Sequence, residues 1–180
     1  MSDISAVRSA LQKFQDGYTS RDVARLDEFM QLFVQSESVE MIGVGASKRG
    51  AKEWYEGYNQ VRRFIENDWK YWGDVRLDVE GAKITIHGDV AWLSTTGFLI
   101  QTQAFDTAID FYLQEMKSFF ERGDLSADEK LVEATHFGMR RWRERAKGTE
   151  YSWSLIFTAV LLQVGAEWCF HTQHWAMPVD

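Results

Sequence analysis

The first half of the chain alternates hydrophobic and polar positions at the spacing of helices. Near the N-terminus the apolar positions step by three and four, which places them on one helix face. They are Ile4, Val7, Leu11, Phe14 and Tyr18. A break with capping residues follows at 19–22, and a second amphipathic stretch covers 23–33. Residues 39–44 read as a short strand. These patterns predict two helices and then a strand.

A third helix is predicted over residues 54–72, where apolar side chains again recur every three or four positions and Gly73 ends the pattern. From residue 74 the period changes to two, which is typical of strands with one polar face. Strands are expected over 74–79, 83–87 and 90–98, with a hairpin turn at Gly88-Asp89. On the last strand Trp92, Ser94, Thr96 and Phe98 share a face.

Residues 104–149 interrupt this strand pattern. Ile109, Leu113, Met116 and Phe120 have helical spacing, and Ser126 with Glu129 forms a capping box that opens a further helix. Strands return at 151–164 and 168–177. The chain therefore predicts one α+β domain over 1–180, with N-terminal helices on a curved antiparallel sheet and a helical insert at about 104–149.

The composition restricts the function classes. Aromatic residues make up 14% of the chain, enough to line a core, a pocket or an interface. Cys169 stands alone, so no intramolecular disulfide framework is expected. Neither a membrane-spanning apolar run nor a signal peptide is apparent. We expect a cytoplasmic protein with no membrane partner. The net charge of −7 argues against nucleic acid as a partner.

A basic run at 140–147 is open to two interpretations. It contains a tryptophan among four arginines and could contact nucleic acid or an acidic partner. Cations are also favourable at the negative end of a helix dipole, which makes a solvated helix end the preferred interpretation.

Metal and nucleophile chemistry receive little support. His171 and His174 are three apart on a strand and project to opposite faces, so one metal ion cannot readily take both. Cys169 is expected to be a buried, inert thiol. We predict no metal and no cofactor.

The ordered elements resemble the SnoaL-like branch of the nuclear transport factor 2-like superfamily. The resemblance spans about 1–103 and 150–180 and leaves the insert uncovered. The matching motifs are Phe14…Gly17-Tyr18…Arg21-Asp22…Leu26…Phe29-Met30…Phe33, Gly50…Glu53-Trp54…Gly57, Asp68-Trp69…Trp72-Gly73, Gly88-Asp89-Val90-Ala91-Trp92, Phe157-Thr158-Ala159-Val160-Leu161 and Trp168…Gln173-His174-Trp175.

The resemblance implies a cone-shaped fold in which a curved sheet and helices enclose a cavity, and in which many members dimerise through the outer sheet face. It leaves the reaction open. A ketosteroid isomerase site would need a tyrosine and two carboxyl groups at positions that fall near Phe14, Met41 and Thr158, none of which can serve. The catalytic residues therefore remain unassigned.

The aromatic rows, with a few polar groups among them, predict a ligand cavity of roughly a few hundred cubic ångströms. Its lining is expected to comprise Tyr18, Tyr58, Trp69, Trp72, Trp92, Thr96 and His174. Flat apolar ligands are favoured over sugars or phosphates, since no phosphate loop and no convergent arginine pair is apparent.

Three functions follow from these observations. The first is a SnoaL-like protein that binds a small apolar or aromatic molecule. The second is an acid–base enzyme (an isomerase, cyclase or dehydratase) acting on a polycyclic or aromatic substrate, with His174 or His171 as base. The third is an interaction scaffold that uses the insert.

A homodimer is also expected. Leu93, Leu99, Ile156 and Leu162 are predicted to lie outside the cavity, which leaves more apolar surface than a monomer usually exposes. The insert could cover part of this surface, within one subunit or across the dimer.

Overall fold

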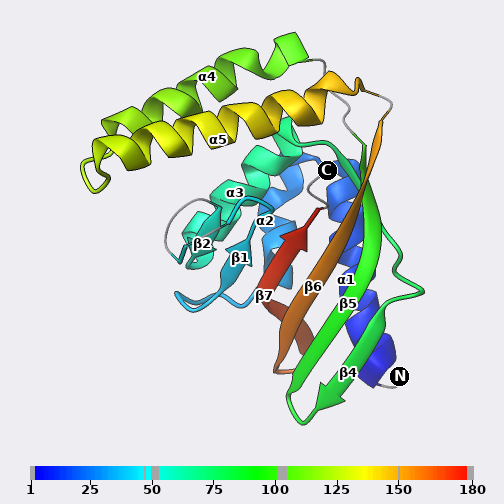
Figure 1. The fold of residues 1–180 in the computed structure, drawn as a ribbon. Helices are drawn as coiled ribbons and strands as arrows, with labels where there is room; N and C mark the ends of the chain where they lie inside the picture. The colour runs from blue at the N-terminus through cyan, green and yellow to red at the C-terminus, as the bar shows by residue number, and fades with distance from the viewer. Residues whose placement is uncertain (1–2, 47, 50–52, 101–104, 150, 178–180) are drawn as a thin grey trace. The chain divides into compact units, whose positions relative to one another are not determined.

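A computed structural model describes residues 3–46, 48–49, 53–100, 105–149 and 151–177 (Figure 1). The chain divides into two compact units. The core unit comprises Met1–Leu99 and Trp153–Asp180, and the hairpin unit comprises Ile100–Ser152. Each unit is described by itself.

The helices of the core unit come early in the chain, as the periodicity predicts. α1 spans Asp3–Ser20, and the break after it is capped by Asp22, whose side chain accepts a hydrogen bond from the Ala24 amide. The second amphipathic stretch forms three short pieces rather than one helix. They are the 3-10 helix η1 (Val23–Arg25), α2 (Leu26–Phe29) and the 3-10 helix η2 (Met30–Leu32).

The third predicted helix starts later than its periodicity indicates. Trp54–Glu56 form strand β2, and α3 covers Tyr58–Tyr71. The boundary is Gly57, whose φ of 85° lies in the left-handed region that favours glycine. The helical spacing of Trp54 to Tyr58 was therefore misleading, because a strand and a helix on either side of a turn can both point apolar residues at the core.

One mixed sheet runs in the order β2-β1-β7-β6-β5-β3, with β4 paired to β5. The remaining strands are β1 (Glu40–Ile42), β3 (Asp74–Leu77), β4 (Lys83–His87), β5 (Val90–Ile100), β6 (Ser152–Val164) and β7 (Glu167–Ala176). β1 runs parallel to β7, with Met41 beside Gln173. A purely antiparallel sheet was expected, so this pairing is a correction. The α+β fold class itself is confirmed.

α1 packs on one face of the sheet and is fastened there by a buried glutamine. The Gln15 side-chain amide donates to the Val75 carbonyl oxygen at 2.7 Å, and its oxygen accepts from the Leu77 amide at 2.5 Å. Both polar ends of this buried side chain are therefore satisfied by β3 backbone. Between α1 and the sheet lies a continuous hydrophobic core that includes Val7, Leu11 and Phe14.

The hairpin unit confirms the predicted helical insert between β5 and β6. It contains α4 (Phe105–Glu121) and α5 (Ala127–Ala146). Ser126 and Glu129 form the capping box that the sequence indicated. The basic run is less solvated than expected, because Arg141 pairs with the buried Glu144 at 2.9 Å and Arg145 donates to the Tyr112 hydroxyl at 2.5 Å.

No helix within the described ranges is both long and apolar enough to cross a membrane.

Candidate functional site

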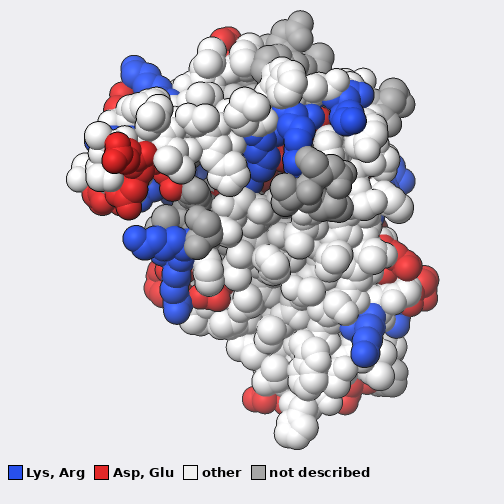
Figure 2. Space-filling view, viewed as in Figure 1, with Lys and Arg blue, Asp and Glu red and all other residues white. Residues whose placement is uncertain are grey.

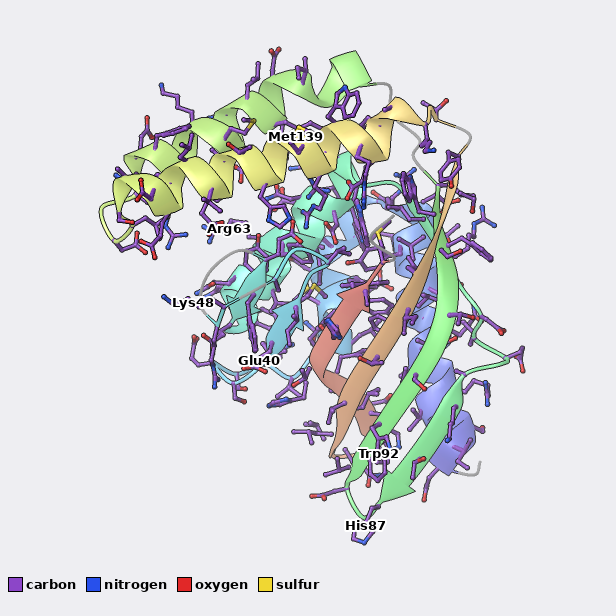
Figure 3. The ribbon with its side chains drawn as sticks, in the orientation of Figure 1. Glu40, Lys48, Arg63, His87, Trp92 and Met139 are labelled. Atoms are coloured by element: carbon purple, nitrogen blue, oxygen red, sulfur yellow. The ribbon has the colours of Figure 1, made fainter. Side chains whose placement is uncertain are left out.

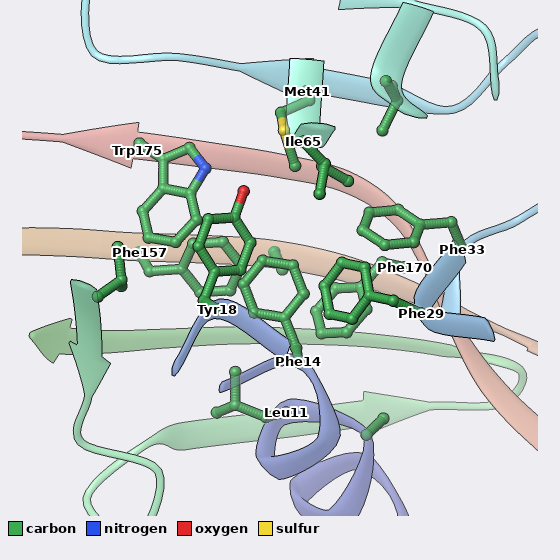
Figure 4. Packing of buried hydrophobic residues seen from close by; sticks show 14 of the residues in the cluster. Leu11, Phe14, Tyr18, Phe29, Phe33, Met41, Ile65, Phe157, Phe170 and Trp175 are labelled. Atoms are coloured by element: carbon green, nitrogen blue, oxygen red, sulfur yellow. The ribbon is translucent and has the colours of Figure 1, made fainter. Parts of the chain in front are cut away.

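Aromatic rings fill the space between α1, α3 and the sheet (Figure 4). Phe14 is in ring contact with six of them at centroid distances of 4.9 to 6.1 Å, including Phe157 at 5.1 Å and Phe170 at 4.9 Å. We call this set the aromatic interior. It comprises Phe14, Tyr18, Phe29, Phe33, Trp69, Trp72, Phe157, Phe170 and Trp175, all of them buried.

A buried hydroxyl–carboxyl pair lies within the aromatic interior. The Tyr18 hydroxyl donates to Oδ2 of Asp68 at 3.2 Å, and both residues are buried. Burial raises the pKa of Tyr18 well above its usual value, and the negative charge of Asp68 and the hydrogen bond to it raise the pKa further. Tyr18 is therefore a neutral hydrogen-bond donor at physiological pH.

The side chain of Gln173 is fully buried without a partner. Its exposed fraction is 0%, and neither its amide nitrogen nor its amide oxygen has a hydrogen-bond partner in the structure. Its cross-strand neighbours are Met41 on β1 and Ala159 on β6, which offer no side-chain hydrogen bond. Gln173 thus differs from Gln15, the other buried glutamine described above.

Two tryptophans bring further unpartnered donors to the same region. The indole nitrogens of Trp69 and Trp175 are buried and make no hydrogen bond in the structure. Trp175 follows Gln173 on the core face of β7, and its ring lies 5.5 Å from that of Tyr18. In Figure 4 the Trp175 nitrogen and the Tyr18 oxygen both lie on the side of their rings nearest Ile65 and Met41.

Three of the predicted lining residues come together. Tyr18 and Trp69 meet edge to face at 6.4 Å, and Trp72 meets Trp175 edge to face at 5.4 Å. Tyr58 is half-buried at the start of α3 and packs against the margin of the core. Burial raises its pKa, with a further contribution from the charge of Asp27.

The other three lie on the opposite face of the sheet, which corrects the orientation predicted for β5. Trp92, which is labelled in Figure 3, is 48% exposed. Thr96 and His174 are exposed as well. Leu93 and Leu99, expected outside, are buried in the core. These seven residues therefore do not converge on one cavity.

The physical reason for this orientation lies in the small residues of β5. A Cβ atom at Gly97 would stand 2.4 Å from the Arg76 carbonyl oxygen, so no side chain fits there. Thr95, on the same face, donates through its hydroxyl to the Asp78 carbonyl oxygen at 2.6 Å. Trp92 and Phe98 are too large for such a close approach. The alternation of residues along β5 does not reveal which of its two faces meets the crowded core.

Neither candidate histidine reaches the aromatic interior. His174 stands beside Ile42 and Thr158 on the outer face. The half-buried ring of His171 lies 3.2 Å from the Ser38 hydroxyl and 2.8 Å from that of Thr172. Within the described ranges no group of three His, Cys, Asp or Glu side chains could hold a metal ion.

Cys169 is buried, and burial raises the pKa of its thiol, with a smaller contribution from Glu167. A raised thiol pKa keeps the reactive thiolate scarce at neutral pH.

Sequence reasoning named neither Asp68 nor Gln173 as a site residue, although both carried a signal. Asp68 lies on the apolar stripe of α3, next to Trp69 and three residues after Ile65. Gln173 and Trp175 lie two positions apart on a strand and therefore share a face with apolar residues. A polar residue within a hydrophobic stripe requires a partner when the stripe is buried, and this rule would have identified both.

Comparison with known proteins agrees with this architecture. A family model described as a SnoaL-like domain matches residues 7–108, which is more than half of the chain. The protein therefore belongs to the SnoaL-like family. A search of curated proteins found no match.

Solved structures show the same fold at low sequence identity. A nuclear transport factor 2-like superfamily protein from Salmonella enterica is 12% identical with a TM-score of 0.60, covering 98% of this chain and 92% of that one. A member of the same family from Streptomyces avermitilis, described as a candidate dehydratase, is 11% identical with a TM-score of 0.58, covering 99% and 98%. At these identities the likeness establishes the fold alone.

Proposed function

We propose that the core unit binds a small, flat, apolar or aromatic molecule among the rings of the aromatic interior. The observation that carries this proposal is the side chain of Gln173, fully buried with both polar atoms unpartnered. The indole nitrogens of Trp69 and Trp175 add two further unpartnered donors nearby.

Burying polar groups without partners costs a large share of the net stability of a domain. A buried polar group without a partner costs about 1–3 kcal/mol, and a domain is stable by only about 5–15 kcal/mol. Native proteins retain few such groups, and each of them calls for an explanation, of which a functional role is one. A ligand whose polar end hydrogen-bonds to Gln173 and Trp175 would remove this cost while its apolar body packs against the rings.

The donor and acceptor inventory narrows the ligand class. The amide of Gln173 offers two N–H donors and one acceptor, and each indole offers one donor. A hydroxyl, carboxamide or protonated carboxyl group on the ligand matches this set. The buried polar and charged side chains described in the core unit are Gln15, Asp68, Thr95 and Gln173, with no cation among them. The ligand is therefore expected to be uncharged.

Ligand entry requires the rings to separate. The Trp175 and Phe157 centroids are 4.4 Å apart, and Trp175 and Tyr18 are 5.5 Å apart, which is direct contact. A molecule of one or two fused rings would replace some of these ring contacts with its own. Binding then selects a more open arrangement of the same side chains.

Calorimetry with two related probes tests the proposal. We expect 2-naphthol to bind and 2-naphthalenesulfonate not to bind, because the interior offers the anion no cation and presents Asp68 instead. Gln173→Leu should weaken 2-naphthol binding by about tenfold or more, given the value of one buried hydrogen bond. The exposed Trp92→Ala is the matched control and should bind normally. Equal affinity of wild-type protein and Gln173→Leu would place the site elsewhere.

A second function, acid–base catalysis, is favoured by the Tyr18–Asp68 pair rather than by a histidine. A buried carboxyl group beside a neutral hydroxyl donor can remove a proton and stabilise the resulting oxyanion. If the protein is an enzyme of this kind, it should accelerate exchange of the α-protons of 1-tetralone with deuterated water. Asp68→Asn should abolish that acceleration, whereas the exposed Asp16→Asn should not.

We also propose that the protein acts in the cytoplasm, a reducing compartment. The support is the composition, because a chain with the lone Cys169 has no intramolecular disulfide to maintain. A second copy of the chain is the partner that we propose for it.

A further inference from the structure

A chain of hydrogen-bonded hydroxyl and imidazole groups lies outside the aromatic interior, where the loop before β1 meets β7. The hydroxyl oxygens of Ser36 and Ser38 are 2.8 Å apart, and Nε2 of His171 is 3.2 Å from the Ser38 hydroxyl. On the other side of the imidazole ring, Nδ1 lies 2.8 Å from the Thr172 hydroxyl. We call these four residues the serine–histidine cluster. The ligand proposed above uses none of them.

A β-bulge at His171 brings the side chains of His171 and Thr172 together. Thr172 pairs with Val160 of β6. Phe170 pairs with Leu161, the very next residue of β6, so His171 has no partner on that strand. Successive side chains of a regular strand point to opposite faces, and an extra residue interrupts this alternation. Bulges of this kind are common next to active sites, where they redirect a side chain.

Backbone hydrogen bonds hold the loop that carries Ser38. The Val34 amide donates to the Phe170 carbonyl oxygen of β7 at 2.9 Å. The Tyr58 amide, at the start of α3, donates to the Ser36 carbonyl oxygen at 3.2 Å. These bonds fix the loop against a strand and a helix, and a reactive pair of side chains needs such rigid support.

One direction of donation gives Ser38 the properties of a nucleophile. The Ser38 amide donates to the Ser36 hydroxyl oxygen at 3.2 Å, and the Ser36 hydrogen donates to the Ser38 oxygen. The Ser38 hydroxyl then donates to Nε2 of His171, and Nδ1–H of the same ring donates to Thr172. The imidazole lone pair therefore points at the proton that must be removed. A nucleophile bonded to a base that a third group orients is the signature of covalent catalysis.

We propose that Ser38 is the nucleophile, and His171 the general base, of an esterase site on the outer face of the sheet. The Ser38 oxygen attacks the acyl carbon of an ester while its proton passes to Nε2 of His171. When the ester C–O bond breaks, His171 returns this proton to the departing oxygen, and the acyl group remains on Ser38. Water then releases the acid through the same proton transfers. Thr172 is a positioning residue, because it acts through the ring of His171.

The surroundings of Ser38 narrow the substrate to an uncharged ester with a good leaving group. The exposed carboxylate of Glu37 precedes Ser38 in the chain and disfavours an anionic substrate. The surface over β5, β6 and β7 is largely uncharged (Figure 2). Because the Ser38 amide already donates to Ser36, it does not serve an oxyanion, and the acyl carbon must be activated by its leaving group. Aryl esters of short acids meet these requirements.

Covalent labelling of the full chain tests the proposal. Diisopropyl fluorophosphate forms a phosphoester with an activated serine and releases fluoride, whereas ordinary serines do not react. We expect one adduct per chain, assigned to Ser38 by peptide mass spectrometry, and no adduct on protein unfolded in urea. Absence of an adduct on the folded protein would overturn the proposal, as would an adduct on the exposed Ser154 instead.

Hydrolysis of 4-nitrophenyl acetate tests the two catalytic residues. Ser38→Ala should abolish the initial burst of 4-nitrophenol, and His171→Ala should slow acylation by about a hundredfold, within the usual effect of a general base. His174→Ala removes the exposed histidine of the same strand and is the matched control, which should react like wild-type protein. Equal rates for His171→Ala and His174→Ala would show that the ester reacts elsewhere on the surface.

Two substitutions at Thr172 separate orientation of the imidazole from packing. Thr172→Val loses the hydroxyl and should lower kcat by about tenfold with little change in KM, because one hydrogen bond to the base is lost. Thr172→Ser keeps the hydroxyl and should restore most of the wild-type kcat. A Thr172→Ser variant as slow as Thr172→Val would contradict the orienting hydrogen bond and, with it, the proposed direction of donation.

Discussion

Two buried glutamines in this fold have opposite environments. Gln15 is bonded at both ends to the backbone of β3, and so it fastens α1 to the sheet. Gln173 is more deeply buried and has no partner. The same side chain is therefore a structural element at one position and, on our proposal, a ligand contact at the other.

Replacing each glutamine with leucine should separate these roles. Gln15→Leu leaves two backbone groups of β3 unsatisfied and should lower the free energy of unfolding by about 2–4 kcal/mol. Gln173→Leu removes two unsatisfied atoms at nearly constant volume and should leave stability unchanged or raise it by about 1 kcal/mol. Urea unfolding measures both. Equal destabilisation by the two substitutions would mean that Gln173 is also bonded in the native protein.

The raised pKa of Tyr18 predicts a pH dependence. The hydroxyl ionises at about pH 10 in the unfolded chain and only at higher pH in the folded protein. The stability that it contributes is complete below pH 10 and is lost as the pH rises toward the folded-state pKa. This group should lower the free energy of unfolding by up to about 1.4 kcal/mol per pH unit above 10.

Tyr18→Phe should remove that dependence. The variant should be less stable than wild-type protein at pH 8, because it lacks the hydrogen bond to Asp68. The two unfolding free energies should converge between pH 10 and pH 11. Parallel curves over this range would show that Tyr18 ionises in the folded protein as easily as in the unfolded chain.

At the scale of elements, the orientation of β5 shows what alternation can and cannot predict. The pattern correctly placed Trp92, Thr96 and Phe98 on one face of a strand. It could not say which face meets the core, because both faces carry apolar residues. The decision depends on backbone approach at Gly97, which is a tertiary contact.

A pair of glycine substitutions tests this orientation. Gly97→Ala places a methyl group against the Arg76 carbonyl oxygen and should cost about 2 kcal/mol or more in the free energy of unfolding. Gly123→Ala meets nothing within 4 Å and should be neutral within about 0.5 kcal/mol. Thermal unfolding compares the two. A neutral Gly97→Ala would contradict the described approach of β3 to β5.

Most elements could be read from the sequence, whereas the candidate site could be read only in part. α1, α5 and the long strands follow from period and capping, which are local properties. Tyr18, Trp69 and Trp72 were found because they lie on strongly periodic helix faces. A local pattern could flag Gln173 and Asp68 as polar residues within apolar stripes, but it could not supply their surroundings. Asp68 is bonded to Tyr18, 50 positions away, and the neighbours of Gln173 are on β1 and β6.

At the scale of the whole molecule, the two proposals are independent. Ligand binding rests on the aromatic interior, and ester cleavage rests on the serine–histidine cluster on the outer face of the sheet. Ser38→Ala should therefore leave 2-naphthol binding intact, and Gln173→Leu should leave the labelling of Ser38 unchanged. Loss of 2-naphthol binding in Ser38→Ala would instead show that the two reagents occupy one site.

The most direct test of ligand binding follows the indole N–H signals of the eight tryptophans by NMR during titration with 2-naphthol. Substitution of each tryptophan in turn assigns the signals. Trp69 and Trp175 should show the largest shifts, because their nitrogens gain a hydrogen-bond partner, and exposed Trp92 should not move. Shifts confined to Trp92, or no shift in the Trp69 and Trp175 signals at saturating probe, would contradict binding within the aromatic interior.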